Sequence, residues 1–377
     1  MIFLLVIIGA LTYVVLYYQN VRKYLKGPMP LPIIGNLYHV NQTGILVSDG
    51  EVRMEQRRAA LRIKREHGMG KNLMEAQVNQ SIDELLKQLK ETNDGVKPFD
   101  MNMPIQLCVE NVINETLFGY QFKYSNTAKF EFFINCLNRH LRGLRYQNFI
   151  EEEVNKVAKV YNTNEEPTNF VQSYLAEMKK NPQLDMANLY AIVVDFWLAG
   201  METTSTTLRW GLLHLMKHPQ AKMLSVVGRE RRIEMADKPN LPYFTAAIAE
   251  IQRAANIISF LGTADSFIGG HFIPALTLQI YSVLKDDSVF ERPTEFVPER
   301  FLEADGKTAC KKQLDRLIPF GMGKSQCVGE ALAPMELILG TLLINYRFDA
   351  CEPTDLTPIG GQKNPPMLLP RMERVVI

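Results

Sequence analysis

The chain has 377 residues and a mass of 43.0 kDa, with a 46% share of hydrophobic residues and a 22% share of charged ones. This composition supports a buried core and excludes a wholly disordered, collagen-like or low-complexity chain. The net charge of +1 gives no global sign of nucleic-acid binding, so nucleic acid is not expected as a partner. The five cysteines form no C-x-x-C pair, which argues against a disulfide scaffold and a zinc site.

Residues 1–20 contain no charged side chain, and the run 2–18 is almost entirely apolar. At 1.5 Å per residue such a helix covers about 26 Å, close to the thickness of a thin bilayer. Basic residues follow this run rather than precede it, which favours an uncleaved transmembrane anchor over a cleaved signal peptide. The same charges predict that the rest of the chain lies on the cytoplasmic side. Residues 21–44 are basic and rich in proline, typical of a stiff hinge or of an ordinary linker.

From residue 45 onward the chain is predicted to form one domain that is mainly α with small β-sheets. Apolar spacing predicts helices over 51–67, 72–91, 104–118, 128–143, 147–161, 168–180, 188–217, 242–255 and 328–346. The segment 257–282 is rich in β-branched residues and glycine, which indicates short strands. Prolines make 286–326 a loop-rich region, and the tail beyond 346 has possible strands.

A glycine-rich segment, Phe320 to Gly329, carries a single cysteine, Cys327. We expect this loop to deliver Cys327 to the start of a helix, where backbone N–H groups stabilise a thiolate. Such a thiolate is suited to be the axial ligand of haem iron. Taken alone, the pattern favours a buried structural thiol.

Three further segments are weak signals when taken one at a time. Residues 199–204, Ala-Gly-Met-Glu-Thr-Thr, place an acid and an alcohol in the middle of a buried helix, where they are expected to open the helix locally, bind dioxygen and relay protons. The alternative is that the hydroxyls bond back to their own helix. Residues 250–253 (Glu-x-x-Arg) put opposite charges on one helix face, as a surface ion pair also does. Residues 296–301 form a turn that presents Arg300.

The order and spacing of these four segments along the chain form one pattern. An acid–alcohol helix, then E-x-x-R, then F-x-P-E-R-F, then F-x-x-G-x-x-x-C-x-G resembles the haem-thiolate monooxygenases, the cytochromes P450. The apolar start and the Gly-Pro-x-Pro-Leu-Pro-x-Ile-Gly-Asn hinge resemble the microsomal animal branch of that family. The resemblance covers nearly the whole chain. It implies a helical fold with one haem, endoplasmic-reticulum membrane attachment, and electrons from an NADPH-dependent reductase.

The resemblance also implies roles for individual residues. Cys327 is expected to ligate the iron, and Phe320 to pack on the thiolate side of the haem. The other positions expected to contact or surround the cofactor are Arg57, Gly323, Ala199 and Gly200. Glu202 and Thr203 are expected to deliver protons during reduction of dioxygen to insert one oxygen atom into a lipophilic substrate. A buried ion network is expected from Glu250, Arg253 and Arg300.

The basic stretch 51–71, with seven Lys/Arg against three Glu, resembles the surface on which this family receives its acidic reductase, although it is also typical of a solvated helix face. Other positions depart from the family pattern. Ser325 and Arg53 stand where the family has an Arg or His and a Trp that hold haem carboxylates, and residues 261–266 lack a His-Arg pair with the same task.

The spacing between 35 and 51, and again over 141–147, is short, so the N-terminal part of the sheet and the distal roof are expected to be incomplete. These departures keep two rivals of the monooxygenase open. One is an inactive or weakly haem-binding shortened member. The other is a haem-thiolate isomerase or dehydratase, which the retained Glu202–Thr203 pair disfavours.

Overall fold

The structure is a computed structural model. It describes residues 43–46, 48, 50–66, 72–92, 99–125, 127, 131, 145–162, 164–218, 231–255, 260–261, 266–268, 271–273, 277–278, 280–330, 335–350 and 370–374. The predicted anchor 1–20, nearly all of the hinge 21–44 and nearly all of the predicted helix 128–143 lie outside this part of the chain. Among the described helices, none combines the length and the apolar character needed to cross a bilayer.

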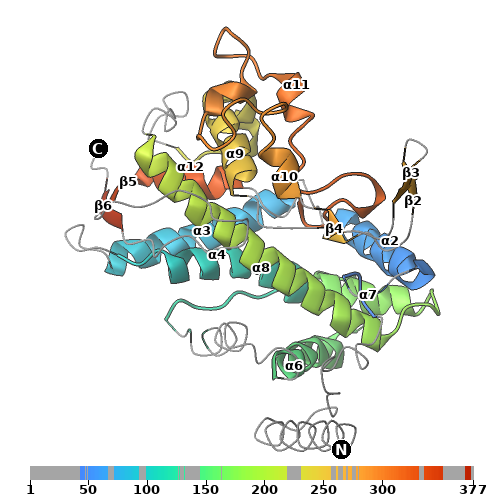
Figure 1. Cartoon of the computed structure of the whole chain (residues 1–377). Coiled ribbons are helices and arrows are strands. Elements are labelled where there is room, and N and C mark those ends of the chain that lie inside the picture. The colour runs from blue at the N-terminus through green and yellow to red at the C-terminus, as the bar shows by residue number, and fades with distance from the viewer. Residues whose placement is uncertain are drawn as a thin grey trace, which may run out of the picture.

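The longest helix, α8 (Met186–Lys217), runs through the centre of the molecule and carries the acid–alcohol segment (Figure 1). Its start is fixed by Asp185, whose side chain accepts a hydrogen bond from the backbone N–H of Asn188 at 2.7 Å. The helix ends before Pro219, which cannot continue an α-helix. Most of its side chains are buried, because other helices pack around it.

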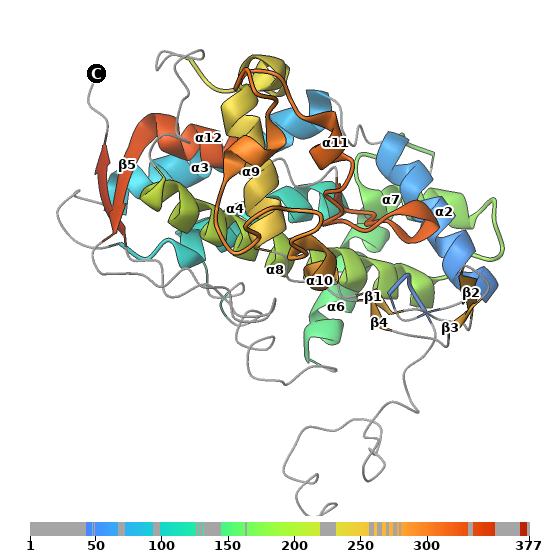
Figure 2. The ribbon, with the colours of Figure 1, turned by 45° about the horizontal axis from the view of Figure 1, so that its top comes forward.

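Helix α4 (Asn102–Phe118) makes the most extensive contact with α8, and Figures 1 and 2 show the two side by side. The indole N–H of Trp197 on α8 donates to Asn114 Oδ1 on α4 at 2.8 Å, so the interface is fixed by a buried polar bond as well as by packing. Gly119 ends α4 in the left-handed conformation (φ 78°), where its N–H satisfies carbonyls of the last turn.

Four other helices surround this pair. Helix α3 (Asn72–Thr92) packs on α4, while α6 (Arg145–Val160) and α7 (Phe170–Met178) pack on each other and on α8. Helix α2 (Gly50–Glu66) lies against α7 and α8. It is held there by Gln56, whose side chain accepts from the Tyr174 hydroxyl at 2.6 Å.

The C-terminal part adds α9 (Pro242–Ala254) and α12 (Met335–Asn345) to the same core. Pro242 stands at the start of α9, where its missing N–H costs no hydrogen bond. A second apolar cluster forms between α9 and the loop-rich region, with Phe290 and Phe301 fully buried. This region is punctuated by short helical segments: η3 (Met235–Asn240), α10 (Ile280–Leu284), η4 (Pro298–Phe301), α11 (Lys311–Leu314) and η5 (Gly323–Ser325).

Strand content in the described residues is limited to three two-stranded antiparallel sheets. They pair β1 (Phe260–Leu261) with β4 (Thr277–Leu278), β2 (Ser266–Ile268) with β3 (His271–Ile273), and β5 (Tyr346–Ala350) with β6 (Pro370–Arg374). The prediction of a mainly helical fold with small sheets is therefore confirmed.

Most predicted helices match the structure to within a few residues, and the largest difference lies at the C-terminal helix. The predicted helix 328–346 corresponds to α12, which begins at Met335. Residues 328–329 instead form a turn directly after Cys327. Apolar spacing alone did not separate this turn from the helix, because Val328 continues the apolar pattern of the helix that follows.

Candidate functional site

The cysteine loop is closed by two hydrogen bonds that involve Cys327. The backbone N–H of Cys327 donates to the Phe320 carbonyl at 2.8 Å, and the N–H of Gly329 donates to Cys327 Sγ at 3.3 Å. Gly323 adopts φ 71°, and a Cβ at this position would meet no atom within 4 Å, so its need for glycine is conformational. The donor to sulfur comes from the turn after the cysteine, not from the N-terminus of α12. The loop thus presents an exposed cysteine with a backbone donor on its sulfur.

The middle of α8 offers a second open surface. Ala199 is exposed although its neighbours along this central helix are mostly buried, and Thr203, one turn later, is half-buried. The Thr203 hydroxyl donates to the Ala199 carbonyl at 2.6 Å, and the Thr206 hydroxyl lies 3.5 Å from a carboxylate oxygen of Glu202. Ala199 is thus an exposed position in the middle of α8, with the Thr203 hydroxyl beside it.

The predicted local opening of α8 is wrong for this structure. The helix is continuous through Gly200, and the Thr203 hydroxyl bonds back to its own helix, which was the alternative interpretation. A Cβ on Gly200 would lie 2.9 Å from Ile113 Cδ1 of α4. Gly200 thus allows α4 and α8 to approach closely, which explains its presence in a buried helix despite its low helix propensity. Its expected place beside dioxygen stays a prediction.

Arg57 links α2 to the cysteine loop. Its Nη2 donates to the carbonyl of Gln326, the residue before Cys327. Burial and the neighbouring charge of Arg53 lower the pKa of Arg57, and the charge of Cys327 opposes that shift. Arg53 itself points elsewhere, because its Nε donates to the Ile45 carbonyl at 3.2 Å. The structure therefore brings Arg57 to the predicted cofactor region and engages Arg53 in fixing the backbone before α2.

Lys64 is a residue that the sequence interpretation missed. It was counted among the charges of a basic helix, yet it is only 2% exposed. Its Nζ has no hydrogen-bond partner within the described part of the chain and lies 3.7 Å from the ring centre of Phe196. Burial lowers the pKa of Lys64 to about 7, and the charge of Cys327 again opposes the shift. Its spacing of seven residues from Arg57, two helical turns, is the signal that places both on one face.

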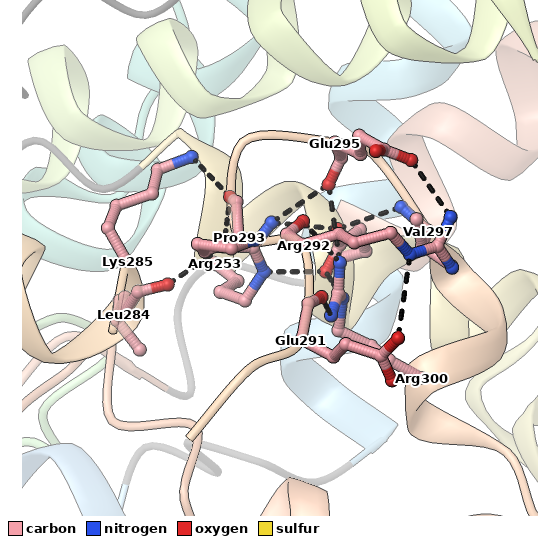
Figure 3. A network of polar contacts seen from close by, with 10 residues as sticks. Arg253, Leu284, Lys285, Glu291, Arg292, Pro293, Glu295, Val297 and Arg300 are labelled. Carbon is pink, nitrogen blue, oxygen red and sulfur yellow. Dashed lines mark hydrogen bonds and ion pairs between the residues drawn. The ribbon is translucent and has the colours of Figure 1, made fainter. Parts of the chain in front are cut away.

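The structure brings Glu250, Arg253 and Arg300 together, and Figure 3 shows the two arginines. Arg253 donates two parallel hydrogen bonds to Glu250, from Nε to Oε2 at 2.7 Å and from Nη2 to Oε1 at 2.8 Å. Arg300 Nε lies 3.1 Å from Glu250 Oε2. The side chains of Glu250 and Arg253 are fully buried, so this is no surface ion pair.

The same group holds the loop-rich region in place. Arg253 also donates to the carbonyls of Leu284, Pro293 and Glu295, at 2.8, 2.9 and 3.2 Å. The N–H of Val297 donates to Glu250 Oε1 at 2.9 Å. Figure 3 shows these carbonyls converging on the guanidinium groups. The network thus ties α9 to the segment that leads toward the cysteine loop.

Comparisons with known proteins match this arrangement. The Cytochrome P450 family profile matches residues 4–147 and 130–374, almost the entire chain. The chain belongs to the cytochrome P450 family. It is 34% identical to cytochrome P450 2K6 of Danio rerio over 378 residues, covering 84% of this chain and 72% of that protein. It is 31% identical to cytochrome P450 2H2 of Gallus gallus, covering 95% and 81%. With cytochrome P450 2J5 of Mus musculus the identity is 30%, covering 79% and 67%.

Membership makes this P450 a haem-thiolate oxidoreductase of the monooxygenase type. The described residues fit the cofactor in three respects. A cysteine with an amide donor on its sulfur is exposed, an apolar stretch of α8 is open at Ala199, and a buried amine, Lys64, is without a hydrogen-bond partner. The exposed cysteine and the open stretch of α8 are the surfaces that a haem would cover.

Proposed function

We propose that this P450 inserts one oxygen atom from dioxygen into a lipophilic small molecule, with electrons from an NADPH-dependent reductase. The observation that carries the proposal is the loop that holds Cys327 exposed, with the Gly329 amide donating to its sulfur. When bound, the haem supplies the activation of dioxygen and the one-electron chemistry. Cys327 is its proposed ligand, Phe320 and Gly323 shape the loop, and Arg57 is the cation available to a haem carboxylate.

The residues of α8 are proposed to deliver protons and to exclude water. The Thr203 hydroxyl, which now donates to Ala199, has a second role open to it, since a hydroxyl both donates and accepts. A rotation about its Cα–Cβ bond would turn it from the helix toward the open surface at Ala199. The Glu202 carboxylate is the neighbouring group that resupplies a proton. The apolar surface around Ala199 keeps competing water away.

The Glu250–Arg253–Arg300 network is proposed to fix the loop-rich region that precedes the cysteine loop. From α9 it contacts backbone groups between 284 and 297, and from η4 Arg300 donates to carbonyls between 291 and 295, so the network acts on backbone position. Because its members are buried and paired with one another, they are not available to a substrate.

The reductase is proposed to dock on α2. Arg58, Arg62 and Arg65 of this helix are exposed, which gives an acidic partner three cations on one element. Two of them are already paired, Arg58 with Glu55 at 2.8 Å and Arg62 with Glu177. Residues 1–20 are proposed to anchor the chain in the endoplasmic-reticulum membrane, with the haem domain on the cytoplasmic side.

A second candidate is a P450 that binds haem weakly and turns over no substrate. One observation favours it. Arg53, at a position where the family resemblance expects a haem-carboxylate contact, donates instead to the Ile45 carbonyl. Charge-assisted hydrogen bonds contribute about 1.5–3 kcal/mol each, so missing contacts weaken haem retention.

The test is turnover by the full chain in vesicles with haem and NADPH–cytochrome P450 reductase. A lipophilic probe such as a 7-alkoxycoumarin should give product that depends on NADPH and dioxygen. Thr203→Ala should raise the hydrogen peroxide released per NADPH consumed several-fold. Thr203→Ser keeps the hydroxyl and should leave the ratio of product to NADPH unchanged. Low haem content together with absence of product across a probe panel would favour the second candidate. Equal coupling in Thr203→Ala would contradict the assigned role of Thr203.

A further inference from the structure

A pocket lies between the loop that follows α4 and the second half of α6. Its volume is about 570 Å³, which is within the range of sites that hold small molecules. It is lined by residues 120–123 of the loop and by residues of α6 between 153 and 160. The lining includes no residue of α2, α8 or the cysteine loop, so the site proposed for the haem does not account for this pocket.

The loop wall of the pocket is fixed by α4. Asn111 of this helix is fully buried and bonds to both backbone groups of Phe122. The Phe122 N–H donates to Asn111 Oδ1 at 2.7 Å, and Asn111 Nδ2 donates to the Phe122 carbonyl at 3.0 Å. The rings of Tyr120 and Phe122 meet edge to face, with centroids 5.6 Å apart. The pocket therefore has a rigid aromatic wall that a ligand need not order on binding.

Glu153 of α6 forms the polar centre of the pocket. Only 7% of its side chain is exposed, and its two oxygens accept from different donors. The Tyr120 hydroxyl donates to Oε2 at 2.9 Å, and Lys156 Nζ donates to Oε1 at 2.6 Å. Burial and the charge of Glu153 raise the pKa of Tyr120, so its phenol stays a neutral donor. The Lys156 ammonium has three N–H groups, so it can bind Glu153 and an anionic ligand together.

The charges of the lining residues favour an anion. Lys123 and Lys156 carry two positive charges against the single negative charge of Glu153, and both lysines are exposed. The rest of the α6 wall is apolar, because Val157 is half-buried and Val160 is 79% exposed. A cationic ligand would be repelled by the two lysines, and a small inorganic anion would leave the valines in water. An anion with an apolar body matches both ends of the pocket.

We propose that this pocket is a binding site for an amphipathic monocarboxylate, such as an aromatic acid or a medium-chain fatty acid. The carboxylate lies between Lys123 and Lys156. The apolar body lies against Phe122, Val157 and Val160. Two lysines against one glutamate give the lining a net charge of +1, which matches one carboxylate better than a doubly charged phosphate group. The site is separate from the haem site, so the inference does not depend on the proposed oxygen chemistry.

The test is photo-crosslinking of the full chain, with haem bound and in vesicles of zwitterionic lipid, to 4-benzoylbenzoate. This probe is an aromatic carboxylate that light activates. Mass spectrometry of the digested protein should place the cross-link within residues 120–123 or 153–160, whereas a probe bound at the haem would label other peptides. Benzophenone has the same rings without the carboxylate and should label the pocket about tenfold less, the effect of one lost charge-assisted contact.

Lys123→Met and Lys156→Met each remove one positive charge at similar side-chain length. Each should raise the probe concentration for half-maximal labelling by about tenfold, while Lys156→Arg, which keeps the charge, should restore it. Lys159→Met is the matched control, because Lys159 is an exposed lysine of the same helix that does not line the pocket, and it should change nothing. Thermal unfolding of each variant checks that it folds.

Val160→Glu tests the apolar end of the pocket. Because Val160 is 79% exposed, the fold should tolerate the change, and the new carboxylate should repel the probe and abolish labelling. Decanoate should compete with the probe, whereas decanol and inorganic phosphate should not. Equal labelling by benzophenone and 4-benzoylbenzoate would overturn the inference. So would displacement by phosphate, which would show that charge alone is recognised, or unchanged half-maximal concentrations in both Lys123→Met and Lys156→Met.

Discussion

Arg253 on α9 and Lys64 on α2 are both buried basic residues, but their hydrogen-bond partners differ. Arg253 donates to both carboxylate oxygens of Glu250 and to three backbone carbonyls. Lys64 faces a phenyl ring, and its Nζ lacks a hydrogen-bond partner in the described residues. The first site is satisfied by backbone and side-chain groups of the described chain, whereas the described residues supply no hydrogen-bond acceptor to the second.

The difference separates what folds the chain from what binds its cofactor. A buried charge that is fully paired fixes conformation, and breaking it leaves its partners unpaired. A buried charge without a partner destabilises the empty protein and stabilises the complex with an anion. Arg253 therefore stabilises the fold through its partners, while Lys64 is a buried amine for which the described residues offer only the ring of Phe196.

The largest expected effect comes from breaking the satisfied site. Arg253→Met leaves the Glu250 carboxylate buried and removes the donors to three carbonyls. The free energy of unfolding should fall by about 3–5 kcal/mol. Urea denaturation measures this loss. Arg292→Met is the control, because Arg292 forms an exposed ion pair with Glu295 at 2.9 Å and should cost less than about 1 kcal/mol. A loss below 1 kcal/mol for Arg253→Met would remove the contrast between the two sites.

The second prediction concerns the haem-free protein and has the opposite sign. The pKa of Lys64 is lowered by burial from 10.5 to about 7, so between these values the unfolded chain binds a proton that the folded chain does not. Stability should therefore rise with pH from about 7 to about 10.5 and be lowest below pH 7. Lys64→Met should remove this dependence and stabilise the haem-free protein at pH 7 by on the order of 2–4 kcal/mol.

Denaturant unfolding of wild type and Lys64→Met at pH 6.5, 8 and 9.5 measures this effect. Lys159→Met again serves as the control, since an exposed lysine should leave the pH dependence unchanged. A Lys64→Met variant that is less stable than the wild type at every pH would show that Lys64 is already partnered, and the comparison with Arg253 would collapse.

A third buried basic group sharpens the comparison with a smaller effect. His214 on α8 stacks on Phe296, with ring centres 4.4 Å apart. Burial and the nearby charge of His218 lower its pKa from 6.5 to about 3. The imidazole of His214 is therefore neutral at pH 7. It differs from Arg253, which is charged and paired, and from Lys64, whose amine has no hydrogen-bond partner among the described residues. Below about pH 6.5 the unfolded chain protonates this histidine, whereas the folded chain does so only near pH 3. The free energy of unfolding therefore falls as the pH drops from about 6.5 toward 3.

His214→Phe should keep the ring stack and remove this acid sensitivity, a gain of roughly 2–3 kcal/mol at pH 4 relative to wild type. The free energy of unfolding at pH 7 and pH 4 measures it. If both proteins lose the same stability between the two pH values, other groups cause the acid sensitivity and His214 is not the neutral base that the structure indicates.

The sequence predicts the paired site well and misses the unpaired one. Glu250 and Arg253 are three residues apart, and this spacing puts them on one face of a helix whatever packs against it. Arg300 joins them across 47 residues, which only the family pattern indicated. The burial of Lys64 was not predicted, because a lysine in a basic helix is normally exposed. Its burial depends on which face of α2 meets α8. The same limit applies to Gly200, whose closeness to Ile113 depends on the position of α4.

The central claim is that Cys327 ligates haem as a thiolate in this chain, and the spectrum of the reduced carbon monoxide complex tests it most directly. The full chain, expressed with added haem, reduced and exposed to carbon monoxide, should show a red-shifted Soret band. Cys327→Ala should abolish that band, while Cys310→Ala, which changes a cysteine in the loop-rich region, should leave it unchanged. No red-shifted band in the wild type, or a band that survives Cys327→Ala, would contradict the account.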